Sequence, residues 1–433
     1  MYASLKSTVW QFFYGVVALT LAVSPVLAQS DINQPPINYS TAPVNDAIAR
    51  LQQQIDSGEI KLEWDKQHGW LPSVLDLLKI PRSSQLLVFS KTSLQLAKIS
   101  PRTPRVLYFN DEVYIGSVQS GAVLEVSAVD SQQGAIFYAL DQKPSDTPKF
   151  RRSDNDCLTC HQNRRTQDVP GYLVRSVYPG KSGHPHFELG TTTTDQTTDF
   201  HDRFGGWYVT GKHGKLRHRG NMIASKNAHP PIDPELGANV TDLASRLNTD
   251  HYLTKHSDMV ALMVLEHQAQ MHNFITHANY EARQTKYYDA TWNKVLNRPE
   301  GHRSEVSQRR LASASEKLLR YLLFSGEFRL TSPIEGTSDF AAEFESIGPH
   351  DSQGRSLRQF DLNTRLFKYP CSFLIYGDAF AALPDNIREV IDGRLQEILS
   401  GEDQSPEFAH LSPEDRTAIR EILEETLPGF LKP

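Results

Sequence analysis

The sequence predicts an α+β protein with a β-rich N-terminal half and a helical C-terminal half. Two observations support this fold class. Between residues 85 and 140, short runs of β-branched and aromatic residues alternate with turn residues, which is typical of antiparallel strands. From residue 242 onward, apolar residues instead recur at helical spacing. Segregation of strands and helices along the chain favours α+β over an alternating α/β architecture.

The predicted strands form a meander. The turn pairs Asn110-Asp111, Ser120-Gly121 and Gln133-Gly134 separate successive apolar runs, as expected for connections between antiparallel neighbours. The runs cover residues 86–89, 106–109, 113–118, 123–129 and 136–140, and strand-like segments return at 172–177 and 206–210.

The clearest predicted helix covers residues 258–280. Met259, Met263, His267 and Met271 follow one another at i+4 spacing and therefore share one face. Ser412 followed by Pro413 is a helix-start signal, because serine caps the first turn and proline fits the first helical position. Further helices are predicted over 46–55, 313–324, 386–399 and from 412 onward.

The first 28 residues resemble a secretory signal peptide. Lys6 precedes an apolar run over residues 9–27, and Val26-Leu27-Ala28 has the residue sizes of a cleavage site, so we place cleavage after Ala28. An uncleaved membrane anchor is the alternative, since the run is almost long enough to span a bilayer. The signal predicts a periplasmic or otherwise exported protein. We divide the remainder into a linker over 29–44, a β-rich region over 45–150 and a region over 151–433.

Charge and composition limit the possible partners. Removal of residues 1–28 takes away Lys6 and no acid, which changes 45 basic residues to 44 against 51 acidic ones and gives a charge of −7. A mildly acidic chain without a long basic run gives no reason to expect nucleic-acid binding. No later segment is apolar for long enough to predict a stable membrane span after signal removal.

The strongest motif is Cys157-Leu158-Thr159-Cys160-His161, which matches C-x-x-C-H. Two thiols one helical turn apart can add to the two vinyl groups of one porphyrin, and the adjacent imidazole can then bind the iron. A thiol–disulfide redox motif, half of a zinc site and a chance match are the alternatives. The chain has only three cysteines, so an exported protein of this length gains no disulfide framework from them.

The five residues resemble the haem-binding motif of c-type cytochromes. The resemblance implies one covalent haem c, with Cys157 and Cys160 as thioether partners and His161 as the axial iron ligand. It covers little of the chain, whose strands after the motif differ from a compact cytochrome. The chain as a whole looks like large single-haem exported bacterial proteins of uncharacterised role. The region over 151–433 is thus interpreted as a cytochrome c-like haem-binding region with a helical C-terminal part.

Several side chains could supply a sixth iron ligand. The glycine-rich segment over 205–222 contains His213, His218 and Met222, and the helix over 258–280 adds His267 and Met271. A methionine ligand favours electron transfer, whereas an open position permits substrate chemistry. Solvated histidines and core methionines are the alternative interpretation of these residues.

Four arginines flank the motif, at positions 151, 152, 164 and 165. They could pair with the anionic haem propionates or form a solvated basic surface for an acidic redox partner. Cys371 has apolar neighbours and is interpreted as a buried structural thiol.

We expect a periplasmic electron-transfer protein that works with a redox partner protein. One alternative is a haem oxidoreductase of peroxidase type, because the chain is far longer than a carrier needs and offers His, Arg and Glu as acid–base groups. Another is a haem-based redox or gas sensing module.

Overall fold

The structure is a computed structural model that describes residues 32–427 and residue 429. The predicted signal peptide over 1–28 lies outside the described residues. Residues 32–44, which the sequence analysis assigns to a linker, instead pack into the core: Ile32, Ile37 and Tyr39 are buried. The Tyr39 hydroxyl donates to the carbonyl of Ala135 at 2.7 Å, which ties this segment to the sheet.

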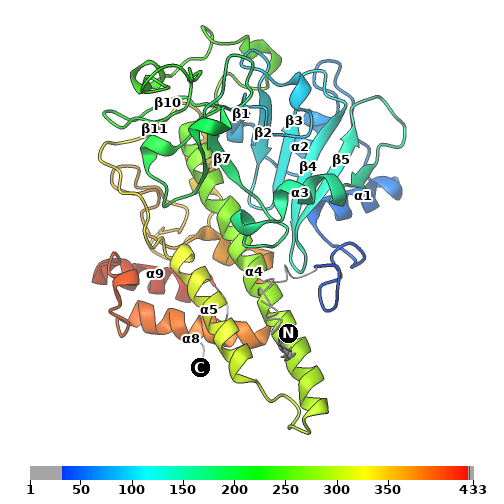
Figure 1. The fold of residues 1–433 in the computed structure, drawn as a ribbon, viewed down its shortest axis with the longest axis vertical. Helices are drawn as coiled ribbons and strands as arrows, with labels where there is room; N and C mark the ends of the chain where they lie inside the picture. The colour runs from blue at the N-terminus through cyan, green and yellow to red at the C-terminus, as the bar shows by residue number, and fades with distance from the viewer. Residues whose placement is uncertain (1–31, 428, 430–433) are drawn as a thin grey trace, which may run out of the picture. The chain divides into compact units, whose positions relative to one another are not determined.

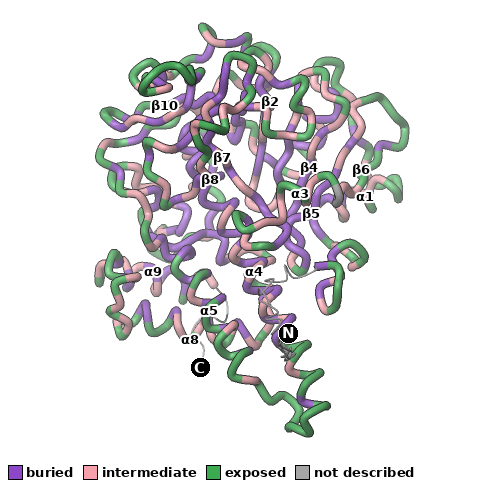
Figure 2. The backbone as a smooth tube through the Cα atoms, in the orientation of Figure 1, coloured by how far each residue is buried: buried purple, intermediate pink, exposed green. Residues whose placement is uncertain are grey.

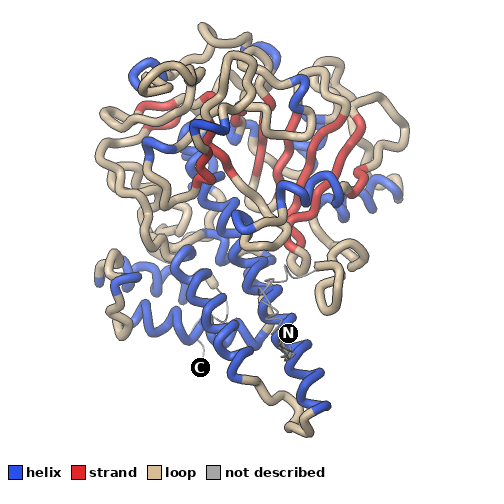
Figure 3. Tube along the Cα trace, viewed as in Figure 1, coloured by secondary structure: helices blue, strands red, loops and turns tan. Residues whose placement is uncertain are grey.

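A seven-stranded antiparallel sheet forms the β-rich half (Figure 1, Figure 3). The strand order is β6-β5-β4-β3-β2-β1-β9, so consecutive strands pair as a meander and only β9 joins from a distant part of the sequence. The predicted meander is confirmed. The strands are β1 (Leu86–Val88), β2 (Arg105–Phe109), β3 (Val113–Ser117), β4 (Val123–Asp130), β5 (Gly134–Asp141), β6 (Phe150–Arg152) and β9 (Trp207–Tyr208).

Both faces of the sheet are covered, because its alternating side chains enter two different cores. Val126 and Ile136 point into a core with α1 (Ala47–Asp56) and α2 (Leu71–Leu77), while Phe137 and Val129 point into the larger core. Small two-stranded sheets add β7 (Val174–Val177) with β8 (Thr191–Thr194), and β10 (Gly211–Lys212) with β11 (Glu335–Gly336).

Helices dominate the C-terminal half, as predicted. The longest, α4 (Met259–Val295), has 37 residues and lies against the sheet for its first turns, while its last turns are exposed (Figure 2). The other helices are α3 (Asp154–His161), α5 (Glu305–Leu322), α6 (Phe340–Ser346), α7 (Asp378–Ala381), α8 (Asp385–Ser400) and α9 (Pro413–Thr426). No helix among the described residues has the length and apolar character needed to cross a bilayer.

The boundary at residue 150 does not separate two structural units. Strand β9, which follows the boundary, pairs with β1, which precedes it, and the larger core contains Val88 and Phe137 together with Leu262 and Ile391. The described residues from 32 onward accordingly form one compact unit.

Asp258 fixes the start of α4. Its Oδ1 accepts from the backbone N–H groups of Val260 and Ala261, and its Oδ2 accepts from the N–H groups of Thr337 and Ser338, both at 2.8 Å. The residue is 1% exposed. One carboxylate therefore caps the helix and holds the segment after β11 against it.

We expect Asp258→Ala to lower the free energy of unfolding by about 2–4 kcal/mol, because it removes a helix cap and leaves buried N–H groups without an acceptor. Asp258→Ser can still cap α4 but cannot reach both segments, so its loss should be smaller. Urea denaturation of the two variants measures the difference; equal losses would show that the contacts to Thr337 and Ser338 add no stability.

Candidate functional site

The C-x-x-C-H motif occupies the second half of α3, which lies against the sheet near β5 (Figure 1). Cys157 is half-buried and packs against the larger core, whereas Cys160, one turn later, is exposed. The helical spacing places the two thiols on neighbouring turns of one helix. This arrangement satisfies the spacing that attachment to a single porphyrin requires.

His161 is held at the end of α3 by Gly171. The His161 Nδ1 lies 2.9 Å from the Gly171 carbonyl oxygen, and the Gly171 N–H donates to the His161 carbonyl at 2.9 Å. Because a carbonyl oxygen only accepts, Nδ1 carries the proton and Nε2 keeps its lone pair. Burial lowers the pKa of His161, which favours the neutral imidazole that a metal needs.

The return of the chain from His161 to Gly171 is anchored by α4. Asn273 accepts from the Tyr172 N–H at 2.8 Å through Oδ1 and donates to the Tyr172 carbonyl at 2.7 Å through Nδ2. A Cβ atom at position 171 would overlap the Asn273 amide, so this close approach requires glycine. The ring of Phe137, 4.8 Å from that of His161 between centroids, closes the other side.

An ion pair lies on the same face of the sheet as Phe137. Glu125 is two residues before Ser127, the cross-strand partner of Phe137, and therefore points to the same side. Its Oε2 is 2.7 Å from Nη2 of Arg105, whose guanidinium lies over Gly116 where no side chain intervenes. The Arg105 Nε is buried and has no hydrogen-bond partner in the described protein.

Arg175 supplies a second incompletely paired cation. It belongs to β7, its Nη2 donates to Thr191 Oγ1 at 3.0 Å, and its guanidinium lies 5.6 Å from the centre of the Phe187 ring. Its Nε is also buried without a hydrogen-bond partner in the described protein. Burial and the nearby charge of Arg165 lower the pKa of Arg175, an effect that Cys160 opposes.

These residues fit a covalently attached haem c. The two thiols are one turn apart, and the imidazole keeps a lone pair on Nε2. This fit is judged from the thiols of Cys157 and Cys160 and the imidazole of His161.

The candidate sixth ligands in the glycine-rich segment are engaged elsewhere. The His213 Nε2 accepts from the Asn239 N–H at 2.8 Å while Nδ1 lies 2.8 Å from the Leu216 carbonyl, so neither nitrogen has a lone pair to offer. In His218, Nδ1 accepts from the Gly220 N–H at 2.9 Å, which leaves the proton on Nε2. Met222 packs in a separate small apolar cluster.

The candidates on α4 lie in the larger core. Both nitrogens of His267 are hydrogen-bonded: Nδ1 lies 2.5 Å from Gln196 Oε1, and Nε2 lies 2.8 Å from Ser372 Oγ. Met271 is fully buried in the same core. None of the five candidates makes a hydrogen bond, ion pair or ring contact with His161 in the described structure. The core interpretation accounts for the positions of these side chains.

The flanking arginines have separate roles. Arg151 pairs with Asp141 at 2.7 Å, and Arg152 donates to the Tyr39 carbonyl at 2.7 Å and lies over the Tyr39 ring. Arg164 and Arg165 are exposed. Cys371 is fully buried in the larger core, as expected, and burial raises the pKa of its thiol.

Sequence reasoning missed the residues that surround the motif. Arg105 and Phe137 come from strands that precede it, and only the sheet register brings them to the same face. Gly171 contributes a backbone carbonyl, which no side-chain pattern reveals. Arg175 lies in a segment recognised as a strand, yet nothing in that pattern indicates which charged residue is incompletely paired.

No protein-family model matches the chain, and neither a curated protein nor a solved structure is detectably similar to it.

Buried neutral histidines predict a loss of stability in acid. Burial lowers the pKa of His218 to about 3, below its usual value of 6.5, and the charges of His213 and Arg217 act in the same direction. Between these two pH values the His218 imidazole binds a proton in the unfolded chain but not in the folded chain. The free energy of unfolding therefore falls as the pH is lowered from about 6.5, by about 1.4 kcal/mol per pH unit for each such group.

We expect His218→Asn, whose side-chain oxygen can still accept from Gly220, to make the free energy of unfolding less dependent on pH. The slope should fall by about 1.4 kcal/mol per pH unit, which corresponds to one proton. Urea denaturation at a series of pH values between 4 and 8 measures it. His302→Asn, at an exposed position, tests whether removal of any imidazole has the same effect. An unchanged slope in His218→Asn would contradict the assignment.

Proposed function

We propose that this chain is an exported electron-transfer protein that carries one covalent haem c. Cys157 and Cys160 would form the thioether bonds, and His161 would bind the iron through Nε2. The observation that carries the proposal is the hydrogen bond of 2.9 Å between His161 Nδ1 and the Gly171 carbonyl, because it selects the tautomer and the ring orientation of an axial ligand. When bound, the haem exchanges one electron between its ferric and ferrous states.

The surroundings of the site support transfer of electrons to a protein partner. Cys160 is exposed, so a porphyrin attached to it would be accessible to a partner protein. Arg164 and Arg165 are exposed beside it and complement an acidic partner surface. Arg105, on the same face of the sheet as Phe137, and Arg175, near Cys160, would contribute positive charge beside the haem that tunes its potential.

The attachment of haem can be tested directly. We expect the full chain, produced in a periplasm that contains a haem-attachment system, to give a haem-stained band on a denaturing gel and sharp reduced absorbance bands. Replacing both Cys157 and Cys160 with serine should abolish the stain, whereas Cys371→Ala should retain it. An unstained wild-type band would exclude covalent haem. The motif would then be interpreted as a thiol–disulfide pair or as half of a zinc site.

The role of the arginines has its own measurement. A cation near the haem favours the ferrous state, which has the lower net charge, so Arg105→Gln and Arg175→Gln should lower the reduction potential. We expect about a tenfold change in the ferric-to-ferrous ratio, or about 59 mV for one electron. Arg151→Gln is the matched control, because this arginine lies on the edge strand and is paired with Asp141. Equal shifts in all three variants would contradict a specific effect of Arg105 and Arg175 on the haem.

The ferric absorbance spectrum separates a carrier from an enzyme. A six-coordinate spectrum that does not respond to cyanide or peroxide agrees with electron transfer. A five-coordinate spectrum that shifts on addition of either ligand would replace the proposal with a peroxidase-like haem oxidoreductase.

A further inference from the structure

The end of the hairpin formed by α4 and α5 extends beyond the other described elements (Figure 1, Figure 2). Residues 286–309, the hairpin tip, comprise the last turns of α4, the connecting loop and the start of α5. The Asn293 amide donates to the His302 carbonyl at 2.8 Å, and Asp289 accepts from the Ser304 N–H at 3.3 Å. These two hydrogen bonds close the loop, so the tip has a defined conformation of its own.

One face of the hairpin tip is apolar and exposed. Tyr288, Trp292 and Val295 follow one another at i, i+4 and i+7 and therefore share a face of α4, and Leu296 continues it at the helix end. These four side chains are between 47% and 65% exposed. A helix face toward solvent usually carries polar residues, and apolar side chains gathered on one surface indicate a contact with another surface.

The charge of the hairpin tip is opposite in sign to that of the chain. The tip has five basic and three acidic residues, a net charge of +2, whereas the whole chain has a net charge of −6. Arg303 pairs with Glu389 at 3.0 Å, and the other four cations are exposed and make no ion pair among the described residues. The basic residues are Lys286, Lys294, Arg298, Arg303 and Arg309, and the acidic ones are Asp289, Glu300 and Glu305.

The first described residues lie beside the same end of α4. Arg283, one turn before Tyr287, donates to the Pro36 carbonyl at 3.0 Å. In the sequence, the apolar run over residues 9–27 ends nine residues before Pro36. Nine residues span at most about 30 Å. An uncleaved anchor, the alternative to signal cleavage, would therefore bring this end of α4 to a bilayer.

A bilayer surface suits the hairpin tip better than a protein partner does. A stable protein–protein interface takes about 800 Å² and about 20–30 residues from each partner. Four apolar side chains on the last turns of α4 do not supply that area. A bilayer needs no complementary shape, because Trp and Tyr rings are favoured at the level of the headgroups and Lys and Arg are attracted to anionic lipid.

We propose that the hairpin tip binds the surface of a bilayer that contains anionic lipid. Tyr288, Trp292 and Val295 enter the headgroup region, and the four unpaired cations lie beside anionic headgroups. The contact is separate from the proposed haem and does not depend on it.

Co-sedimentation of residues 29–433 with lipid vesicles tests the proposal, because this form lacks the apolar run. The described residues from 32 onward form one compact unit, so this form retains the whole core. We expect binding to vesicles of equal parts phosphatidylglycerol and phosphatidylcholine. Binding to phosphatidylcholine alone should be at least tenfold weaker, because the electrostatic attraction is absent.

Trp292→Ser should weaken binding to the anionic vesicles about tenfold, because the largest apolar side chain of the tip is lost. Lys294→Glu should weaken it by about the same factor, because the charge is reversed. Leu236→Ser and Lys66→Glu are the matched controls at exposed positions outside the tip, and both should leave binding unchanged.

Absence of binding to the anionic vesicles, equal binding to both kinds of vesicle, or equal losses in the tip and control variants would each overturn the proposal. A lipid-free dimer in sedimentation velocity that Trp292→Ser dissociates would also overturn it and assign the tip to a second copy of the chain. If a tip variant does not fold, the comparison of the two kinds of vesicle on the unsubstituted chain decides the question.

Discussion

The packing of α4 across one face of the seven-stranded sheet is the constraint on which the rest of the structure depends. Its first turns bury almost every side chain, apolar and polar, between the sheet and the C-terminal helices. Burial on that scale favours hydrogen-bonded polar groups, and the Gln268 and Asn273 side-chain amides and the cap at Asp258 make such bonds. The sheet and the helical half consequently share one core, and neither has a separate hydrophobic interior on that side.

The haem-type motif depends on this packing although it lies outside α4. A helix of eight residues holds little stability of its own, and α3 is positioned by its contact with β5 and by the chain that returns to Gly171. Asn273 fixes that return by pairing with both backbone groups of Tyr172. The orientation of His161 is thus set by a rigid helix through two hydrogen-bonded steps, which is the kind of support that a metal ligand needs.

Much of the architecture could be predicted because its signals are local. Alternating runs between turn residues located the strands from residue 86 to 141, helical spacing of apolar residues located α4 and α8, and the Ser412 cap located α9. The tertiary features could not be predicted: β9 pairs with a strand more than a hundred residues away, and Ile32 and Tyr39 are buried in a segment whose composition is that of a linker. The same limit applies to the site, where the motif was evident but Arg105, Gly171 and Asn273 were not.

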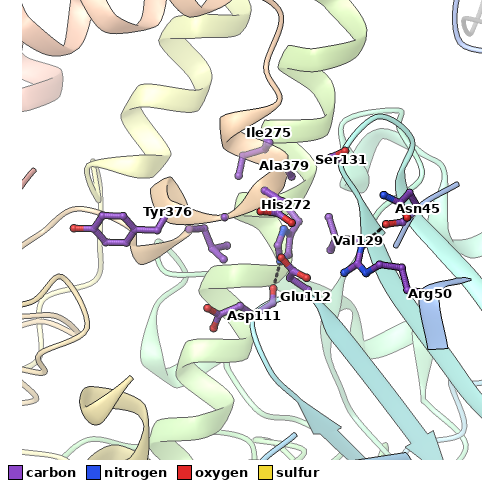
Figure 4. Close-up of a pocket in the computed structure, with 13 residues that line it drawn as sticks. Asn45, Arg50, Asp111, Glu112, Val129, Ser131, His272, Ile275, Tyr376 and Ala379 are labelled. Carbon is purple, nitrogen blue, oxygen red and sulfur yellow. Dashed lines mark hydrogen bonds between the residues drawn. The ribbon is translucent and has the colours of Figure 1, made fainter. Parts of the chain in front are cut away.

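His272 and Asn273 are consecutive residues of α4 that contact different parts of the chain. His272 donates through Nε2 to the Asp111 carbonyl at 2.8 Å (Figure 4, dashed line), and Asn273 holds the backbone segment that carries the acceptor of His161. A displacement of this turn of α4 therefore changes the contacts of both His272 and Asn273. Linkage is reciprocal, so a change at the Asp111 turn that shifts this part of α4 would also reorient His161, and a constraint on His161 would shift the Asp111 turn with the same coupling free energy.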